Sequence, residues 1–125
     1  MPASQSPTVR LNVWLDDKGD LVFGHGRAIL LKAVDEAGSL RKAAEELGMS
    51  YRGAWGKIKK SEEILGFPLL EKAGGNKRGY QLTAKGRELM ESYFRWFDAV
   101  EDMAFRMARE IFPWDVQPFG GDGED

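Results

Sequence analysis

A chain of 125 residues with 42% hydrophobic content is long enough for one domain with a modest core. It contains no cysteine, which excludes a disulfide scaffold, a cysteine nucleophile and a thiolate metal site. The chain lacks both a run of roughly 18 apolar residues and the apolar segment of a signal peptide, so we expect a soluble, cytoplasmic protein without membrane association.

The formal net charge of −2 is distributed unevenly along the chain. Residues 1–38 carry 4 basic and 5 acidic side chains, for a net charge of −1. Residues 39–87 carry 11 basic and 5 acidic side chains, and residues 88–125 carry 3 basic and 10 acidic ones. Local charge rather than total charge determines the attraction to phosphate groups. The basic middle segment therefore favours contact with nucleic acid in spite of the acidic total.

The chain before the basic segment is predicted to contain a short hairpin and one helix. Residues 1–8 are polar with two prolines, and we expect them to be disordered. Apolar positions alternate in residues 11–15 and recur in 21–23, a pattern typical of two hairpin strands. In residues 27–37 they recur every three or four positions, which predicts a core-facing helix that ends at Gly38.

Residues 39–66 are predicted to form two helices joined by a tight turn. Ser39 is a favourable N-cap for a run of strong helix formers, and Gly48 allows the left-handed backbone that ends this helix. Ser50 caps a second helix, whose inward stripe consists of Ala54, Ile58, Ser61 and Leu65. This spacing is typical of a helix-turn-helix, in which the second helix enters the DNA major groove. The helical pattern alone fits an ordinary charged surface helix equally well.

The next segment predicts the hairpin of a winged helix. Two short strands, within residues 67–72 and 80–82, flank the glycine-rich basic loop 73–79. This loop lacks the Gly-Lys-Ser/Thr ending and the spaced glycines of nucleotide-binding loops, so a wing is favoured over a nucleotide site. The predicted fold class is mainly α with small β-hairpins: a winged helix-turn-helix followed by a long C-terminal helix.

Thr83 is expected to cap that long helix, which covers residues 84–112 and ends before Pro113. Its apolar residues follow a heptad spacing, which favours pairing with the same helix of a second chain over fraying of its second half. The residues expected at this homodimer interface are Leu89, Tyr93, Trp96, Phe97, Val100, Met103 and Met107. The predicted organisation is a disordered N-terminus (1–8), a winged helix-turn-helix (9–83), the dimerisation helix (84–112) and a flexible acidic tail (113–125).

No catalytic constellation can be assembled from the chain. His25 is the only histidine, and a turn or capping role is favoured over a catalytic one. The carboxylate pairs at 16–17, 45–46 and 62–63 are adjacent in sequence, so they do not face each other and are interpreted as solubilising surface. We expect no catalytic residue, no metal site and no cofactor, and hence no enzyme.

The segment Ser50–Trp55, with the sequence SYRGAW, indicates a family. Together with the Leu-Leu-Glu-Lys strand and the Leu-Thr-Ala-Lys-Gly helix start, it closely resembles the N-terminal DNA-binding domain of the ModE family of molybdate-responsive regulators. More distantly it resembles the LysR-type winged helix. The resemblance covers about residues 11–105 and implies DNA binding and a connection with molybdenum.

ModE proteins continue into β-barrel domains that bind molybdate, whereas this chain stops where those domains would begin. The resemblance therefore implies no molybdate site within this chain. Three explanations stay open: a regulator that does not sense molybdate, a regulator that receives its signal from a partner, or a fragment of a longer protein.

Arg52 is the residue expected to read bases, because its guanidinium matches the two acceptors of guanine. Ser50 and the helix N-terminus suit a phosphate, and Gly53 and Gly56 leave room for close approach. Trp55 lies at the border of the inward stripe, so core packing and groove contact are equally favoured. The full predicted DNA-binding set is Ser39, Arg41, Lys42, Ser50, Tyr51, Arg52, Trp55, Lys57, Lys59, Lys60, Lys72, Asn76, Lys77 and Arg78.

The chain is thus predicted to be a sequence-specific transcriptional regulator that binds double-stranded DNA at a palindromic operator as a homodimer. The alternative is a winged-helix module that has lost DNA binding and recruits a protein partner through its long helix.

Overall fold

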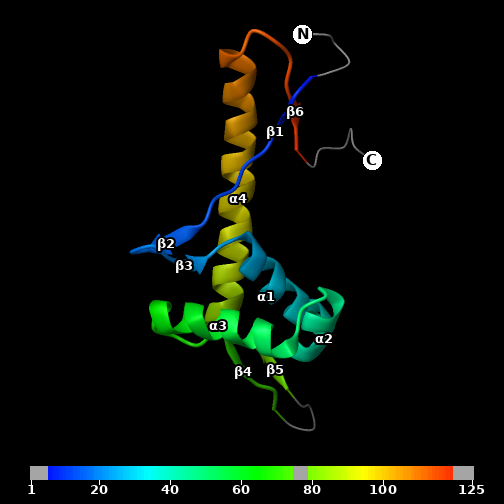
Figure 1. The fold of residues 1–125 in the computed structure, drawn as a ribbon, viewed down its shortest axis with the longest axis vertical. Coiled ribbons are helices and arrows are strands. Elements are labelled where there is room, and N and C mark those ends of the chain that lie inside the picture. Colours follow the sequence, from blue (N-terminus) through cyan, green and yellow to red (C-terminus); the bar gives the residue numbers. More distant parts are fainter. Residues whose placement is uncertain (1–5, 75–78, 120–125) are drawn as a thin grey trace. The chain divides into compact units, whose positions relative to one another are not determined.

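The computed structural model describes residues 6–74 and 79–119. The chain divides into two compact units, one formed by Val13–Phe94 and the other by Met1–Asn12 together with Arg95–Asp125. The elements of both units are labelled in Figure 1. The domain boundaries predicted at residues 83 and 112 stay predictions.

An antiparallel hairpin of β2 (Leu15–Asp17) and β3 (Asp20–Phe23) opens the first unit. Gly19 occupies the turn with a φ of 91°, a conformation that glycine adopts without strain. The prediction that the first strand starts at residue 11 is wrong. Because β3 has only four residues and leads directly toward a helix, the residues before Leu15 have no strand partner in this hairpin.

Three helices follow: α1 (His25–Ala37), α2 (Leu40–Glu46) and α3 (Tyr51–Leu65). Both predicted serine caps are confirmed, because Ser39 Oγ accepts the amide hydrogen of Lys42 and Ser50 Oγ accepts that of Gly53. Gly66 ends α3 in the left-handed conformation. The largest fully buried apolar side chains are Phe23, Leu30, Leu31, Val34, Leu40, Ile58 and Leu69.

One cation lies inside this core. Arg27 of α1 is only 8% exposed, and its Nη1 donates to the carbonyl of Leu21 at 2.9 Å and to Ser61 Oγ at 2.8 Å. Ser61 in turn donates to the carbonyl of Val22. Burial lowers the pKa of Arg27. The network joins β3, α1 and α3, and it explains why a serine occupies an inward position of α3.

The predicted wing is present as β4 (Leu70–Lys72) paired antiparallel with β5 (Tyr80–Leu82). Figure 1 shows these strands side by side below α3. The long helix α4 (Ala84–Ile111) follows, and Thr83 Oγ1 accepts the amide hydrogen of Gly86, as predicted for a cap. Gly86 is itself buried against the backbone of Leu69.

The second unit contains a parallel pair of short strands, β1 (Thr8–Val9) and β6 (Gln117–Pro118). The guanidinium of Arg10 lies 4.1 Å from the ring centroid of Phe119. The predicted disordered start and flexible tail fall partly on residues 1–5 and 120–125, which lie outside the described residues. The predicted fold class, a mainly α winged helix-turn-helix with a long last helix, is confirmed.

Among the residues that the structure describes, no helix is both long and apolar enough to cross a membrane.

Candidate nucleic-acid interface

The outward face of α3 is basic. Ala54, Ile58 and Ser61 are fully buried, so the helical period turns the cations of this helix toward solvent. These cations, Arg52, Lys57, Lys59 and Lys60, are all exposed. No acidic residue occurs between Ser50 and Ser61. The positive end of the helix dipole at Ser50 adds to the same field.

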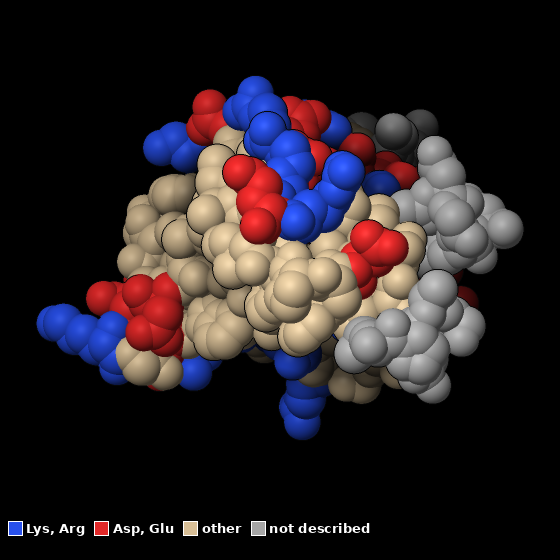
Figure 2. Space-filling view, turned by 90° about the horizontal axis from the view of Figure 1, so that it is seen from above, with Lys and Arg blue, Asp and Glu red and all other residues tan. Residues whose placement is uncertain are grey.

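The distribution of charge on another face is different. In the view of Figure 2, acidic and basic side chains lie directly next to each other at several places. Adjacent charges of opposite sign cancel over short distances, whereas cations of one sign along a helix add. The outward face of α3 is therefore a better phosphate-binding surface than a face of mixed charge.

The cations of α3 differ in whether they are paired. Lys60 Nζ lies 3.7 Å from an oxygen of Asp20 on the hairpin, and Lys59 Nζ lies 3.0 Å from Glu62 Oε1. Arg52 and Lys57 make no ion pair within the described part of the chain. Among the described residues, these two side chains are the α3 cations whose charge no ion pair compensates.

The first turn of α3 is held against α2 by a cation–π contact. The guanidinium carbon of Arg41 lies 4.3 Å from the ring centroid of Tyr51. Arg41 is exposed and Tyr51 is half-buried, so the guanidinium keeps access to solvent. Lys42 is also exposed, and its backbone amide donates a hydrogen bond to Ser39 Oγ. The predicted phosphate-binding residue Arg41 thus lies beside the N-terminus of α3.

Trp55 contacts the wing. Its ring centroid is 4.5 Å from that of Tyr80 on β5, and the planes are inclined by 50°. Lys59 Nζ lies 4.5 Å from the Trp55 centroid. The half-buried ring of Trp55 thus packs against the wing, and a groove contact of Trp55 stays a prediction.

The prediction that Glu62 merely solubilises the surface is wrong. Its side chain is 10% exposed, and Oε2 accepts the amide hydrogens of Leu69 at 2.7 Å and Leu70 at 3.2 Å. These bonds form because the chain reverses after Gly66 and returns alongside α3. Sequence reasoning missed them because no local pattern relates a helical glutamate to amides seven and eight residues later.

The predicted wing contacts are described only in part. Lys72 is exposed on β4, whereas Asn76, Lys77 and Arg78 lie outside the described residues. The described ends of the loop are joined by a hydrogen bond from the amide of Ala73 to the carbonyl of Gly79, at 2.9 Å. Gly79 has a φ of 89°, which favours glycine at this position.

The predicted dimerisation residues of α4 differ in exposure. Tyr93 is buried, donates its hydroxyl to the carbonyl of Val13 at 2.8 Å, and has a pKa raised by burial. Trp96, Met103 and Met107 are exposed, and Leu89, Phe97 and Val100 are half-buried. The structure therefore places Tyr93 in the interior of its own chain and leaves mainly the later members of the stripe at the surface.

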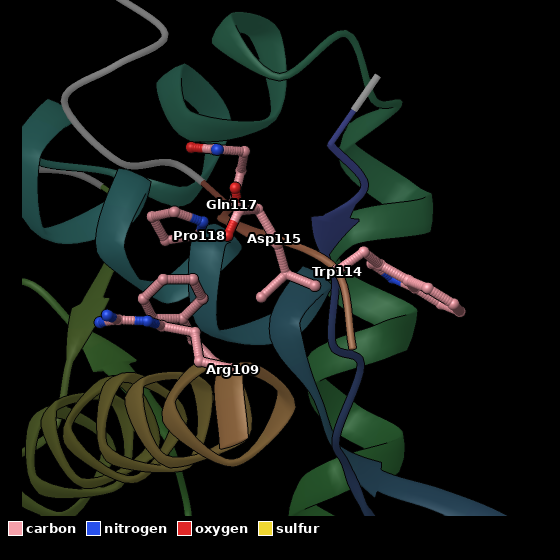
Figure 3. A pocket seen from close by; sticks show the side chains of 7 residues that line it. Arg109, Trp114, Asp115, Gln117 and Pro118 are labelled. Carbon is pink, nitrogen blue, oxygen red and sulfur yellow. The ribbon is translucent and has the colours of Figure 1, made fainter. Parts of the chain in front are cut away.

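A cavity of about 380 Å³ lies within the second unit, between the last turns of α4 and the segment that follows. Phe105, Arg109 and the residues from Trp114 to Pro118 line it, and Figure 3 shows Arg109 and Trp114 extending in opposite directions. None of its lining residues belongs to the predicted DNA-binding set. The described residues contain no cluster of three or more His, Cys, Asp or Glu side chains suited to a metal ion.

The capped pair α2–α3, the β4–β5 hairpin behind it and the basic outward face of α3 together define a winged helix-turn-helix domain. Residues 27–87 match the model of the family described as "Bacterial regulatory helix-turn-helix protein, lysR family". The similarity to this family thus covers α1, α2, α3, the wing and the start of α4.

Similar proteins confirm the resemblance to ModE. The chain is 36% identical over 73 residues to "Molybdenum-pterin-binding protein MopB" of Rhodobacter capsulatus, covering 57% of this chain and 27% of that protein. It is 29% identical over 111 residues to "Molybdenum transport protein ModE" of Azotobacter vinelandii, covering 84% of this chain and 41% of that protein. It is 35% identical over 69 residues to "DNA-binding transcriptional dual regulator ModE" of Escherichia coli K12, covering 54% of this chain and 26% of that protein.

The matched region thus spans less than half the length of each of these relatives. The Escherichia coli relative is named as a transcriptional regulator, in agreement with the prediction that this chain is not an enzyme.

Two solved structures confirm the fold. The CbnR DNA-binding domain in complex with DNA superimposes with a TM-score of 0.56 and 28% identity, over 70% of this chain and 97% of that one. The BenM DNA-binding domain bound to benA site 1 DNA superimposes with a TM-score of 0.53 and 26% identity. This match covers 70% of this chain and 96% of that one. Both are structures of isolated DNA-binding domains with DNA.

Proposed function

We propose that this protein is a transcriptional regulator that binds specific DNA sequences by inserting α3 into the major groove. The observation that carries the proposal is the outward face of α3, where Arg52 and Lys57 are exposed and unpaired within the described residues and no acidic side chain intervenes. The similarity to two DNA-binding domains crystallised with DNA supports it.

Each contact follows from side-chain chemistry. Arg52 in the first turn of α3 reads guanine, because two N–H groups of its guanidinium match the O6 and N7 acceptors. The N-terminus of α3 at Ser50 binds a backbone phosphate. Arg41, Lys57 and Lys72 neutralise further phosphates and fix the position of α3 on the duplex without reading sequence.

The regulator acts as a homodimer in this proposal. Met103, Met107 and Ile111 recur along α4 with exposures of 54%, 50% and 68%. Burying a large apolar side chain stabilises an assembly by roughly 1.5–3 kcal/mol, so pairing of two such helices is favourable. A two-fold dimer presents two α3 helices to DNA, which suits a palindromic operator.

We also propose that the regulated genes concern molybdenum and that the protein acts in the cytoplasm, where bacterial DNA lies. The support is the naming of the relatives as a molybdenum transport protein and a molybdenum-pterin-binding protein. Sensing of molybdate is assigned to a partner or to a segment outside the matched region.

The test is selection of bound sequences from random duplex DNA, followed by titration of the enriched site at several salt concentrations. We expect a palindromic site, an affinity that falls steeply with salt, and relaxed specificity for Arg52→Ala at one base position. If a folded, dimeric protein enriches no sequence, the proposal fails.

That outcome would favour the alternative function, a module that recruits a protein partner through the apolar stripe of α4. The observation that favours this alternative is the exposure of Met103, Met107 and Ile111. It predicts that Arg52→Ala leaves the biological effect intact and that Met107→Glu abolishes it.

A further inference from the structure

Two side chains on one face of α3, Trp55 and Glu62, contact the wing, and Lys59 lies between them. Trp55, Lys59 and Glu62 are spaced by four and three residues, which places them one above the other along the helix. We call this set the α3 bracket. It belongs entirely to the first unit and is described throughout.

Each end of the bracket holds a different strand. At the N-terminal end, the ring of Trp55 packs on Tyr80 of β5 with 4.5 Å between centroids. At the C-terminal end, Glu62 Oε2 accepts the amide hydrogens of Leu69 and of Leu70, the first residue of β4. The two strands are thus attached to the same helix at points two turns apart.

Lys59 connects the two ends. Its Nζ lies 3.0 Å from Glu62 Oε1 and 4.5 Å from the centroid of Trp55. The ammonium therefore faces a carboxylate on one side and an aromatic ring on the other, both of which compensate its charge. A lysine held in this way adds less to the attraction of phosphates than Lys57, which has no ion pair within the described residues.

The wing needs such an attachment. β4 and β5 have three residues each and, among the described strands, pair only with each other. An isolated two-stranded hairpin is at best marginally stable in water, so its orientation depends on what its side chains and backbone contact. Rotation of the wing relative to α3 would break the Trp55 contact, the Glu62 hydrogen bonds or both.

We propose that the α3 bracket sets the orientation of the wing relative to α3, so that both engage the same DNA site together. Trp55, Lys59, Glu62 and Tyr80 are then positioning residues for DNA recognition, and Lys59 is not a phosphate contact. This inference rests on the proposed DNA-binding function and adds to it residues that act through the geometry of the wing.

The first experiment compares two lysines on the same helix. We measure operator affinity against salt concentration for the full chain and for Lys59→Met and Lys57→Met. Loss of a phosphate contact reduces the magnitude of the slope of log K against log salt by about 1. We expect this for Lys57→Met. Lys59→Met should weaken binding about five- to tenfold with an unchanged slope, because it disturbs geometry rather than charge at the phosphates.

The second experiment tests coupling to the wing. The effect of Lys72→Ala on operator affinity is measured in the wild-type background and in Glu62→Gln and Tyr80→Ala backgrounds. If the bracket positions β4 and β5, the effect of Lys72→Ala shrinks in both bracket variants, since the wing no longer holds Lys72 at the duplex. A merely stabilising role would leave the effect of Lys72→Ala the same in all three backgrounds.

A readout without DNA separates this inference from the proposed function. Amide hydrogen exchange at Leu69 and Leu70 should accelerate in Glu62→Gln while exchange in α1 stays unchanged. If the wild type enriches no operator but this acceleration occurs, the proposed function fails and the structural bracket stands. The inference is overturned if Lys59→Met lowers the salt slope as Lys57→Met does, or if both bracket backgrounds bind operator like the wild type. Should Glu62→Gln fail to fold, Tyr80→Ala and Lys59→Met decide the matter.

Discussion

Asp35 of α1 and Arg87 of α4 form a two-pronged ion pair, in which Arg87 Nη1 lies 2.9 Å from Asp35 Oδ2 and Nη2 lies 2.5 Å from Oδ1. The hydrogen bonds from Arg87 hold the pKa of the Asp35 carboxyl below its ordinary value, and the same bonds raise the pKa of Arg87. The pair joins the first helix of the domain to the start of the long helix.

The pair makes stability depend on pH in a defined direction. Because the folded-state pKa of Asp35 is depressed, its contribution is complete above the unfolded-state value of about 3.9 and is lost as the pH falls through the folded-state value. Asp35→Asn should therefore lower the urea midpoint at pH 7, and the difference from wild type should narrow below about pH 4. Glu36→Gln, at an exposed neighbouring position without an ion pair in the described chain, is the control. A difference that persists at low pH would contradict this origin.

Gly86 lets α4 pack directly against the backbone that leads into the wing. A Cβ at this position would lie 2.3 Å from the carbonyl oxygen of Leu69, an atom that cannot rotate away. Gly86→Ala should therefore destabilise the domain by about 1–3 kcal/mol, the usual cost of overpacking, despite the better helix propensity of alanine. Thermal and urea unfolding measure the change.

Gly26→Ala is the matched control for that substitution. Gly26 also lies in a helix, but a Cβ there would meet nothing within 4 Å. It should be neutral or stabilise the protein by up to about 1 kcal/mol. Equal stability of the two alanine variants would show that the contact at Leu69 imposes no constraint.

The positions that could be predicted from the sequence are those governed by local chemistry. Ser39, Ser50 and Thr83 were identifiable as caps because a cap accepts an amide hydrogen only three residues away. Helix periods likewise depend on neighbours within one or two turns. For this reason the order of helices and the wing followed from the sequence, and with them the basic outward face of α3.

Contacts between residues far apart in sequence could not be predicted in the same way. Arg27 and Ser61 are 34 residues apart, and Tyr93 donates to a carbonyl 80 residues earlier. Tyr93 fits the heptad pattern of α4 as well as Met107 does, because a period records which side of a helix is apolar and not which element covers it. Only the packed structure separates the interior member of the stripe from the exposed ones.

The substitution Gly56→Ala tests whether α3 leaves room for DNA at this position at a cost to the stability of the helix. It is exposed in the middle of α3, and a Cβ there would meet no atom within 4 Å. Gly56→Ala should stabilise the free protein by roughly 0.5–1 kcal/mol, because alanine favours the helix. It should also weaken operator binding, because the methyl group would occupy space where the duplex approaches. A variant that is more stable and binds DNA with unchanged affinity would show that no close approach occurs at Gly56.

The apolar stripe of α4 yields the test of the proposed dimer. Met103 and Met107 are adjacent on one side of the helix and about half exposed. In a dimer of α4 helices, Met103→Glu with Met107→Glu would bury like charges at the interface, which costs far more than the lost apolar contacts. We expect a folded monomer by sedimentation equilibrium at concentrations where the wild type is a dimer. Affinity for a palindromic operator should fall toward that for a half-site.

Asp98→Lys is the control for that double variant, because Asp98 is exposed and lies on the side of α4 opposite to Met103. It changes the charge of the helix by a similar amount and should leave the dimer intact. Circular dichroism establishes that α4 stays helical in each variant, so that loss of the dimer is not loss of the helix. If the double variant remains a dimer, this stripe is not the dimer interface. The two α3 helices would then have to be related through another surface, and a palindromic operator would require a different dimer geometry.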